Sequence, residues 1–173
     1  MLYFIFAALI VVIDQLFKAW IAATIVPGTS LPLIPKILHL TYVENTGAAF
    51  SILSDARWLL VALSSVSVVA IIVILLRVKL PRLVKWCAAA ILGGAAGNLI
   101  DRVRTGAVID MFEARFINFA IFNVADIFIT LGCGALIVYY IAEEIRERKS
   151  KAVAAAPENV AAQSPNTSDD DET

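Results

Sequence analysis

The sequence predicts a mainly α-helical integral membrane protein with four transmembrane helices. Of its 173 residues, 60% are hydrophobic, and the mean hydropathy is +0.83, whereas soluble domains are usually about 45–50% apolar. Three apolar tracts are each long enough to cross a bilayer, which takes about 20 residues in a helix. A fourth tract qualifies if polar residues near its start are accepted. The net charge of -1 argues against nucleic acid as the main partner.

The first predicted helix covers residues 3–24. Its apolar run contains Asp14, Gln15 and Lys18, and no basic segment precedes it. Both features favour a membrane helix that is retained over a signal peptide that is removed. Prolines and a glycine between residues 27 and 35 end this helix.

The connection from residue 27 to residue 55 is expected to be ordered. Residues 37–43 are rich in β-formers and partly alternate, which predicts a short strand with His39 on one face. Asn45-Thr46-Gly47 then signals a turn. His39 is the only histidine, which excludes a multi-histidine metal site and argues against Ser/His or Cys/His catalysis.

Three further helices are predicted at residues 58–76, 83–100 and 120–141. The second of these contains Gly93-Gly94-Ala95-Ala96-Gly97, a pattern of small residues that lets membrane helices approach closely. The third carries polar residues near its start.

Basic residues predict how the chain is oriented in the membrane. They gather between the second and third helices and after the fourth: Arg77, Lys79, Arg82, Lys85, Arg146, Arg148, Lys149 and Lys151. Such segments face the cytoplasm, so both termini are expected inside and the other two connections outside. We expect a membrane domain over residues 1–150, followed by a disordered acidic tail over residues 151–173.

Two aspartates, Asp110 and Asp126, lie at the outer edge of the predicted bundle. A carboxylate at a membrane boundary is costly, so it is usually paired and functional. If the two meet, they would share one proton and activate a water molecule, as in an aspartic protease. The alternative is that each carboxylate is solvated on its own.

Other polar residues gather at the same edge. Asn98, Asp101 and Arg102 share one helix face, and Asn123 shares a face with Asp126. The Asp101–Arg102 pair fits a structural helix end. It equally fits a role for the arginine in holding a carboxylate ionised or binding a lipid phosphate.

Asp14 and Lys18 are spaced i, i+4 on the first helix, which favours an ion pair within the membrane over a role in substrate binding. Two other classes of function remain open at this point. A proton- or ion-coupled transporter could use Asp14, Lys18, Asp101 and Asp126 as a relay, although most of these groups crowd one interface. A membrane assembly subunit held by small-residue packing would leave the paired aspartates unexplained.

Five segments resemble the lipoprotein signal peptidases (signal peptidase II) and occur in that family's order. They are Asp14-Gln15-Leu16-Phe17-Lys18, Asn45-Thr46-Gly47-Ala48-Ala49-Phe50-Ser51, Gly93-Gly94-Ala95-Ala96-Gly97-Asn98-Leu99-Ile100-Asp101-Arg102, Val108-Ile109-Asp110 and Phe122-Asn123-Val124-Ala125-Asp126. The resemblance covers about residues 1–150. Single segments are weak signals, but five in order on a four-helix frame are specific.

The resemblance implies an aspartic endopeptidase of the bacterial inner membrane with a small extracytoplasmic sheet. Such enzymes remove the signal peptide from diacylglyceryl-modified prolipoproteins by cleaving before the lipidated cysteine. Asp110 and Asp126 match the catalytic pair. The positions that match the lining of the site are Asn45, Gly47, Asn98, Arg102, Asn123 and Ala125.

Asp14, Lys18 and Asp101 are assigned supporting roles. The connection over residues 27–55 is the candidate for a flap above the substrate. The resemblance implies no metal or organic cofactor, and it implies inhibition by the peptide antibiotic globomycin at the active site. Contact with membrane lipids follows from the four helices, and a monomer is expected because one bundle holds the whole site.

The chain departs from the family pattern at two positions beside the aspartates. Met111 stands where the family commonly has Phe, and Ile127 stands where a small Ser is frequent. Both substitutions are expected to change packing around the pair without removing a catalytic group.

Overall fold

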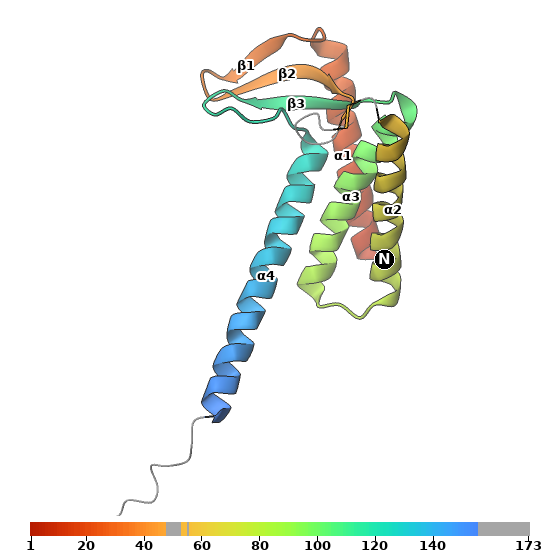
Figure 1. The fold of residues 1–173 in the computed structure, drawn as a ribbon. Helices are drawn as coiled ribbons and strands as arrows, with labels where there is room; N and C mark the ends of the chain where they lie inside the picture. Colours follow the sequence, from red (N-terminus) through yellow and green to blue (C-terminus); the bar gives the residue numbers. More distant parts are fainter. Residues whose placement is uncertain (48–52, 55, 156–173) are drawn as a thin grey trace, which may run out of the picture. The chain divides into compact units, whose positions relative to one another are not determined.

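The computed structural model describes residues 1–47, 53, 54 and 56–155 (Figure 1). Its elements are α1 (Leu2–Thr24), β1 (Ser30–Ile34), β2 (Leu38–Asn45), α2 (Arg57–Arg77), α3 (Arg82–Arg104), β3 (Val108–Ala114) and α4 (Val124–Ala155). The chain divides into two compact units, residues 1–136 and 137–173. The first unit contains the sheet, α1, α2, α3 and the first part of α4. The rest of α4, residues 137–155, is the described part of the second unit.

All four helices are long and apolar enough to cross a membrane. In α2 the buried residues are Leu60 and Leu75, so most of its apolar surface is available to lipid acyl chains. The predicted fold class, a mainly helical membrane protein with four spanning helices and a small sheet, is confirmed.

Helix α3 packs against both α1 and α2, and its glycines permit the close approach to α1 that the sequence predicts. A Cβ atom on Gly97 would lie 2.5 Å from Oδ2 of Asp14, and one on Gly93 would lie 2.8 Å from the carbonyl oxygen of Ala7. Residues without a side chain are therefore required at this contact.

Gly97→Ala is expected to destabilise the protein by about 1–3 kcal/mol. The added methyl group would meet a carboxylate of Asp14 that cannot move away, because Lys18 and the amide of Ala125 both hold it. Thermal unfolding in detergent checks this. Gly134→Ala is the matched control: no atom of the described residues lies within 4 Å of a Cβ added there, and this change gains about 1 kcal/mol within a helix. Equal unfolding midpoints for the two variants would contradict the prediction.

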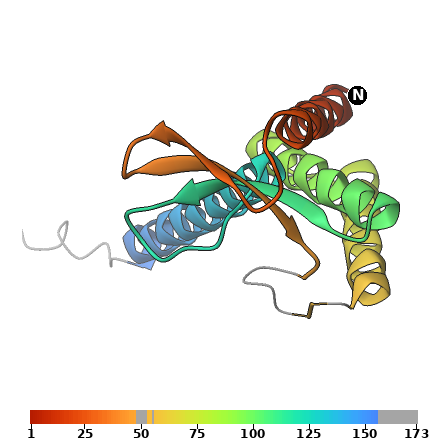
Figure 2. The same cartoon turned by 90° about the horizontal axis from the view of Figure 1, so that it is seen from above.

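The three strands form one antiparallel sheet in the order β1-β2-β3. Seen from above, the sheet lies across the ends of α1 and α3 (Figure 2). It is fastened there by a buried apolar cluster of Ile21, Ile25, Tyr42, Met111 and Val124. Met111 is fully buried in this cluster, so the departure at this position is accommodated by packing beneath the sheet.

The sequence places some boundaries differently from the structure. The predicted strand over residues 37–43 is confirmed as β2, which begins one residue later and runs on to Asn45. The third helix runs on to Arg104, beyond the predicted end at residue 100, so Asp101 and Arg102 belong to its last turns. The fourth helix begins at Val124, later than predicted, because Asn123 caps it.

Two expectations fall partly outside the described residues. The candidate flap includes residues 48–52 and 55, and the acidic tail lies outside from residue 156 onward. The domain boundary expected near residue 150 stays a prediction.

Candidate active site

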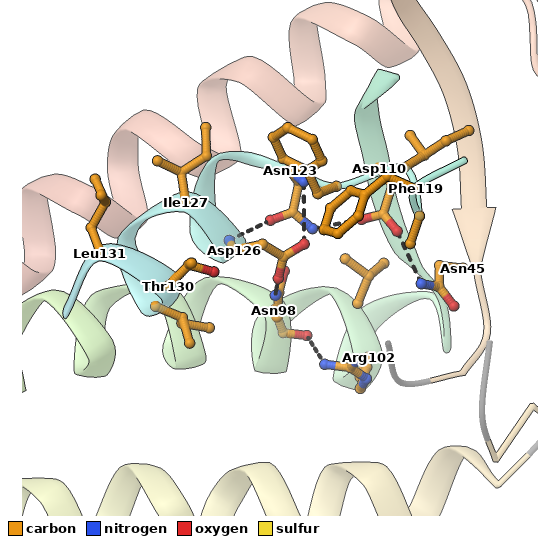
Figure 3. Close-up of a pocket in the computed structure, with 15 residues that line it drawn as sticks. Asn45, Asn98, Arg102, Asp110, Phe119, Asn123, Asp126, Ile127, Thr130 and Leu131 are labelled. Carbon is orange, nitrogen blue, oxygen red and sulfur yellow. Dashed lines mark hydrogen bonds between the residues drawn. The ribbon is translucent and has the colours of Figure 1, made fainter. Parts of the chain in front are cut away.

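Asp110 and Asp126 come from different elements and are joined through Asn123 (Figure 3). Asp110 lies on β3 and is 3% exposed, and Asp126 lies in the first turn of α4. The side-chain amide of Asn123 donates from Nδ2 to Oδ1 of Asp110 at 2.6 Å, and its Oδ1 accepts from the backbone amide of Asp126 at 3.0 Å. One residue therefore holds both aspartates.

Asn123 and Asp126 form a reciprocal cap at the start of α4. Besides the bond just described, the backbone amide of Asn123 donates to Oδ2 of Asp126 at 3.2 Å. This arrangement is a capping box, in which the first residue and the one three positions later satisfy each other's backbone amides. The helix start thus fixes the Asp126 side chain next to β3.

Two further asparagines complete the contacts of the pair. Asn45 donates from Nδ2 to Oδ2 of Asp110 at 2.9 Å, and Asn98 donates from Nδ2 to Oδ1 of Asp126 at 2.8 Å. Each of the four carboxylate oxygens therefore accepts a hydrogen bond from a neutral donor. Such bonds orient a carboxylate and favour its charged form without neutralising it.

Arg102 and Gly47 link α3 to the residues after β2. Arg102 donates from Nη2 to the carbonyl oxygen of Gly47 at 3.1 Å, and the amide of Gly47 donates to Oδ1 of Asn45 at 2.9 Å. Gly47 thus orients Asn45 through its backbone. The Nε of Arg102 is buried and has no hydrogen-bond partner within the described part of the chain, and Arg102 also lines the cavity beside the aspartates.

Burial raises the pKa of Asp110 from 3.8 to about 6. The hydrogen bonds from Asn45 and Asn123 lower it, and the charge of Asp126 raises it further. The folded protein therefore favours the neutral form of Asp110. That contribution to stability is complete below the unfolded value of 3.8 and is lost as the pH rises through about 6.

A cavity of about 480 Å³ opens beside the pair. Its polar end is formed by the two aspartates with Asn45, Asn98, Arg102 and Asn123, and its walls are mainly apolar: Val108, Phe119, Ala120, Ile121, Phe122, Ile127, Ile129, Thr130 and Leu131. A second cavity of about 350 Å³ touches Asn45 and Asp110 from the side of Asn118. Apolar walls that end at two carboxylates suit a ligand with one apolar and one polar part.

Lys18 lies behind the site and is 2% exposed. Its ammonium group forms ion pairs with Asp14 at 2.8 Å and with Asp101 at 2.7 Å, and it donates to Oδ1 of Asn98 at 2.8 Å. An ammonium group has three donors and no acceptor. Since the oxygen of the Asn98 amide must face Lys18, its NH₂ group must face Asp126.

The other oxygen of Asp14 holds the start of α4. It accepts from the amide of Ala125 at 2.9 Å, a backbone group that the first turn of a helix leaves without an internal partner. Ala125 itself is fully buried and does not line the cavity. The expected ion pair of Asp14 and Lys18 is present, and it contacts both helices that carry the site.

The structure adds residues that the sequence did not single out as site residues. Gln15 donates from Nε2 to Oδ1 of Asp101 at 2.8 Å, and its position next to Asp14 was the available signal. Arg57 donates to the carbonyl oxygens of Arg102 at 3.0 Å and Val103 at 2.7 Å. No local pattern predicts that long-range contact.

The chain is similar to lipoprotein signal peptidases. A family model described as signal peptidase (SPase) II matches residues 6–142. The lipoprotein signal peptidase of Brevibacillus brevis is 43% identical over 140 residues, which are 80% of this chain and 93% of the relative. That of Clostridioides difficile is 37% identical over 148 residues, 86% of this chain and 100% of the relative.

Two solved structures of bacterial membrane enzymes have the same fold. One gives a TM-score of 0.78 at 30% identity and covers 82% of this chain and 88% of that chain. The other gives a TM-score of 0.73 at 30% identity and covers 80% of this chain and 91% of that chain.

Proposed function

The chain belongs to the signal peptidase II family, and from this premise we propose that Asp110 and Asp126 are its catalytic pair. As a member of that family it is a multi-pass bacterial membrane peptidase that processes lipoprotein precursors. This membership replaces the transporter and assembly-subunit alternatives. The observation that carries the proposal is Asn123, at the polar end of a mainly apolar cavity. Its side-chain amide donates to the carboxylate of Asp110, and its backbone amide donates to the carboxylate of Asp126.

The pair would work as one acid and one base. An ionised carboxylate removes a proton from water while the other, still protonated, donates its proton to the oxygen of the scissile peptide bond. Two carboxylates this closely linked favour a single shared proton, because both cannot easily be charged. Asn45, Asn98 and Asn123 hold the two groups in place for the attack.

The substrate is proposed to be a prolipoprotein that already carries diacylglycerol. Its acyl chains would lie along the apolar wall that includes Phe119, Ile127 and Leu131, and the peptide would cross the polar end. The guanidinium of Arg102, which lines the polar end of the cavity, would bind a carbonyl or ester oxygen of the bound precursor. Ile127, the second departure from the family pattern, lies on this wall and would contact the lipid.

Several finer features belong to the same proposal. The site lies near the outer face of the membrane with both termini in the cytoplasm, which the basic residues between α2 and α3 and after Glu144 support. The connection over residues 27–55 closes over the substrate, globomycin-type inhibitors occupy the cavity, and a monomer bound to membrane lipids is the active form.

Cleavage of matched precursors tests this function. The purified protein is incubated in detergent with one prolipoprotein in two forms, with and without the diacylglyceryl group, and products are identified by mass spectrometry. Cleavage before the cysteine of the lipidated form alone is expected. Equal cleavage of both forms would contradict the assignment of the apolar wall to the lipid.

Asn45→Ala is expected to move the alkaline limb of the kcat/KM profile upward by about 1 pH unit. The hydrogen bond from Asn45 lowers the pKa of Asp110, so its loss raises that pKa above about 6. An active pair that must hold one proton then keeps it to a higher pH. Rates measured across the pH range check this. Glu44→Gln is the control, because Glu44 is bonded to Tyr42 and not to Asp110. A limb that stays in place or moves down would refute the prediction.

A further inference from the structure

Apolar side chains crowd the end of the sheet at which β1 turns into β2. We define this apolar tip by six residues: Leu31, Leu33, Ile34, Ile37, Phe116 and Ile117. Their exposed fractions range from 46% for Ile34 to 66% for Phe116. The amide of Arg115 donates to the carbonyl oxygen of Ile37 at 2.9 Å, which holds the segment of Phe116 and Ile117 beside the turn. None of these residues lies in a membrane-spanning helix.

The opposite face of the sheet is polar. Oγ of Ser30 and Oγ1 of Thr41 lie 2.7 Å apart, and Thr41 donates to Oε2 of Glu113 at 2.6 Å. The hydrogen bond from Thr41 lowers the pKa of Glu113, so its charge is kept on this face. The sheet is therefore amphipathic. Among the Leu, Ile, Val, Phe and Met residues of its three strands, the exposed ones are Leu31, Leu33 and Ile34, which belong to the tip.

The charge around the apolar tip is positive. Lys36 is exposed in the turn, and the side chain of Arg115 is 48% exposed although it pairs with the more buried Glu113 at 2.8 Å. A second copy of the chain docked tip to tip would bring these cations together. Lipid phosphates offer the opposite charge, and the acyl region beneath them accepts the apolar side chains.

The direction of the strands keeps the apolar tip near the membrane surface. They run across the ends of α1 and α3 and do not extend away from them along the helix axes (Figures 1 and 2). The tip therefore stays near the level at which the helices leave the bilayer.

We propose that the apolar tip is a lipid-contacting surface that rests in the membrane leaflet on the side of the active site. Its six apolar residues enter the region of the glycerol backbone, and Lys36 binds lipid phosphate. Because Asp110 lies on β3 of the same sheet, this contact sets the depth at which the peptide bond of a lipid-anchored substrate meets the aspartates. The lipid contact itself does not depend on which residues are catalytic.

Site-specific fluorescence in vesicles tests the proposal. Cys87 and Cys133, the only cysteines of the chain, are replaced by alanine, and retained precursor cleavage shows that each protein is folded. An environment-sensitive dye is attached at Leu33→Cys or Ile117→Cys. Pro32→Cys is the matched control, because Pro32 is exposed, neighbours Leu33 and pairs with His39 on the polar face. Val66→Cys on α2 marks the membrane interior, since Val66 is 68% exposed on a spanning helix.

The vesicles contain phosphatidylcholine and phosphatidylglycerol, with a doxyl-labelled lipid as membrane quencher and iodide as aqueous quencher. Dyes at positions 33 and 117 are expected to be quenched by the lipid at least about twofold more than the dye at position 32. The dye at position 32 should be quenched more by iodide. Tip dyes that iodide quenches like the control would overturn the proposal. Tip dyes protected from both quenchers would also overturn it, because protein and not lipid would then cover the tip.

Discussion

Asp126→Asn and Asp110→Asn are each expected to lower kcat for a diacylglyceryl-modified prolipoprotein by about 10²–10⁴-fold. Asn has the size of Asp and can still accept the hydrogen bond from Asn98 or Asn45. It can neither remove a proton from water nor hold the shared proton. KM should change less, because the apolar wall that would bind the lipid is untouched.

Single-turnover cleavage by the purified variants, followed by mass spectrometry, measures this effect. Thermal unfolding in detergent shows whether each variant is folded. Glu44→Gln is the control for loss of a nearby carboxylate: Glu44 is exposed and accepts a hydrogen bond from Tyr42 at 3.0 Å, and its neutral form should keep wild-type turnover. If either aspartate variant retains near wild-type kcat, that aspartate is not catalytic.

A catalytic role also explains why the protein keeps the buried carboxylate of Asp110, which lowers its stability at neutral pH. Burial favours the neutral form of Asp110 and raises its pKa to about 6, so at neutral pH its ionised form lowers stability. Two hydrogen bonds to Asp110, from the side chains of Asn45 and Asn123, offset part of that cost. Perturbed carboxylates of this kind cluster at functional sites.

The helical part of this fold is predictable because it depends on local composition. Long apolar tracts must form helices in a bilayer, where each backbone group needs an internal partner. The sheet is harder to predict. Residues 37–43 alternate enough to indicate a strand, whereas β3 places Asp110 between apolar neighbours and gives no clear period.

The start of α4 shows a local signal that a hydrophobicity count misses. Asn123 and Asp126 have the spacing of a capping box, which places the helix start at Val124. The apolar residues from Ala120 favour an earlier start by composition. Asn123, which caps α4, also links the two aspartates. The residue that fixes the start of the helix therefore also positions the catalytic pair.

Contacts between distant segments cannot be inferred from spacing. Asp14 and Lys18 are neighbours on one helix face, and their ion pair is predictable. Nothing local indicates that Lys18 also binds Asp101 and Asn98 on α3. Lys18 therefore does more than pair with Asp14. It binds Asn98, and Asn98 in turn donates a hydrogen bond to Asp126.

We expect the second large effect from a variant that removes the charges of Asp14, Lys18 and Asp101 together. Lys18→Met alone would leave Asp14 and Asp101 buried without their cation, which is strongly destabilising. The triple variant Asp14→Asn, Lys18→Met, Asp101→Asn removes all three charges at similar volume and is expected to fold. Without the ammonium group, the Asn98 amide is free to turn its oxygen toward Asp126, which would remove a hydrogen bond from the catalytic carboxylate.

The triple variant should therefore show a kcat about 10–100-fold below wild type, as when outer partners of catalytic groups are lost, with a smaller change in KM. Separate kcat and KM values, with thermal unfolding as the check on folding, distinguish two roles for Lys18. If it only stabilises the bundle, a folded neutral variant will turn over like wild type. If it orients Asn98, a folded variant will bind substrate and cleave it slowly.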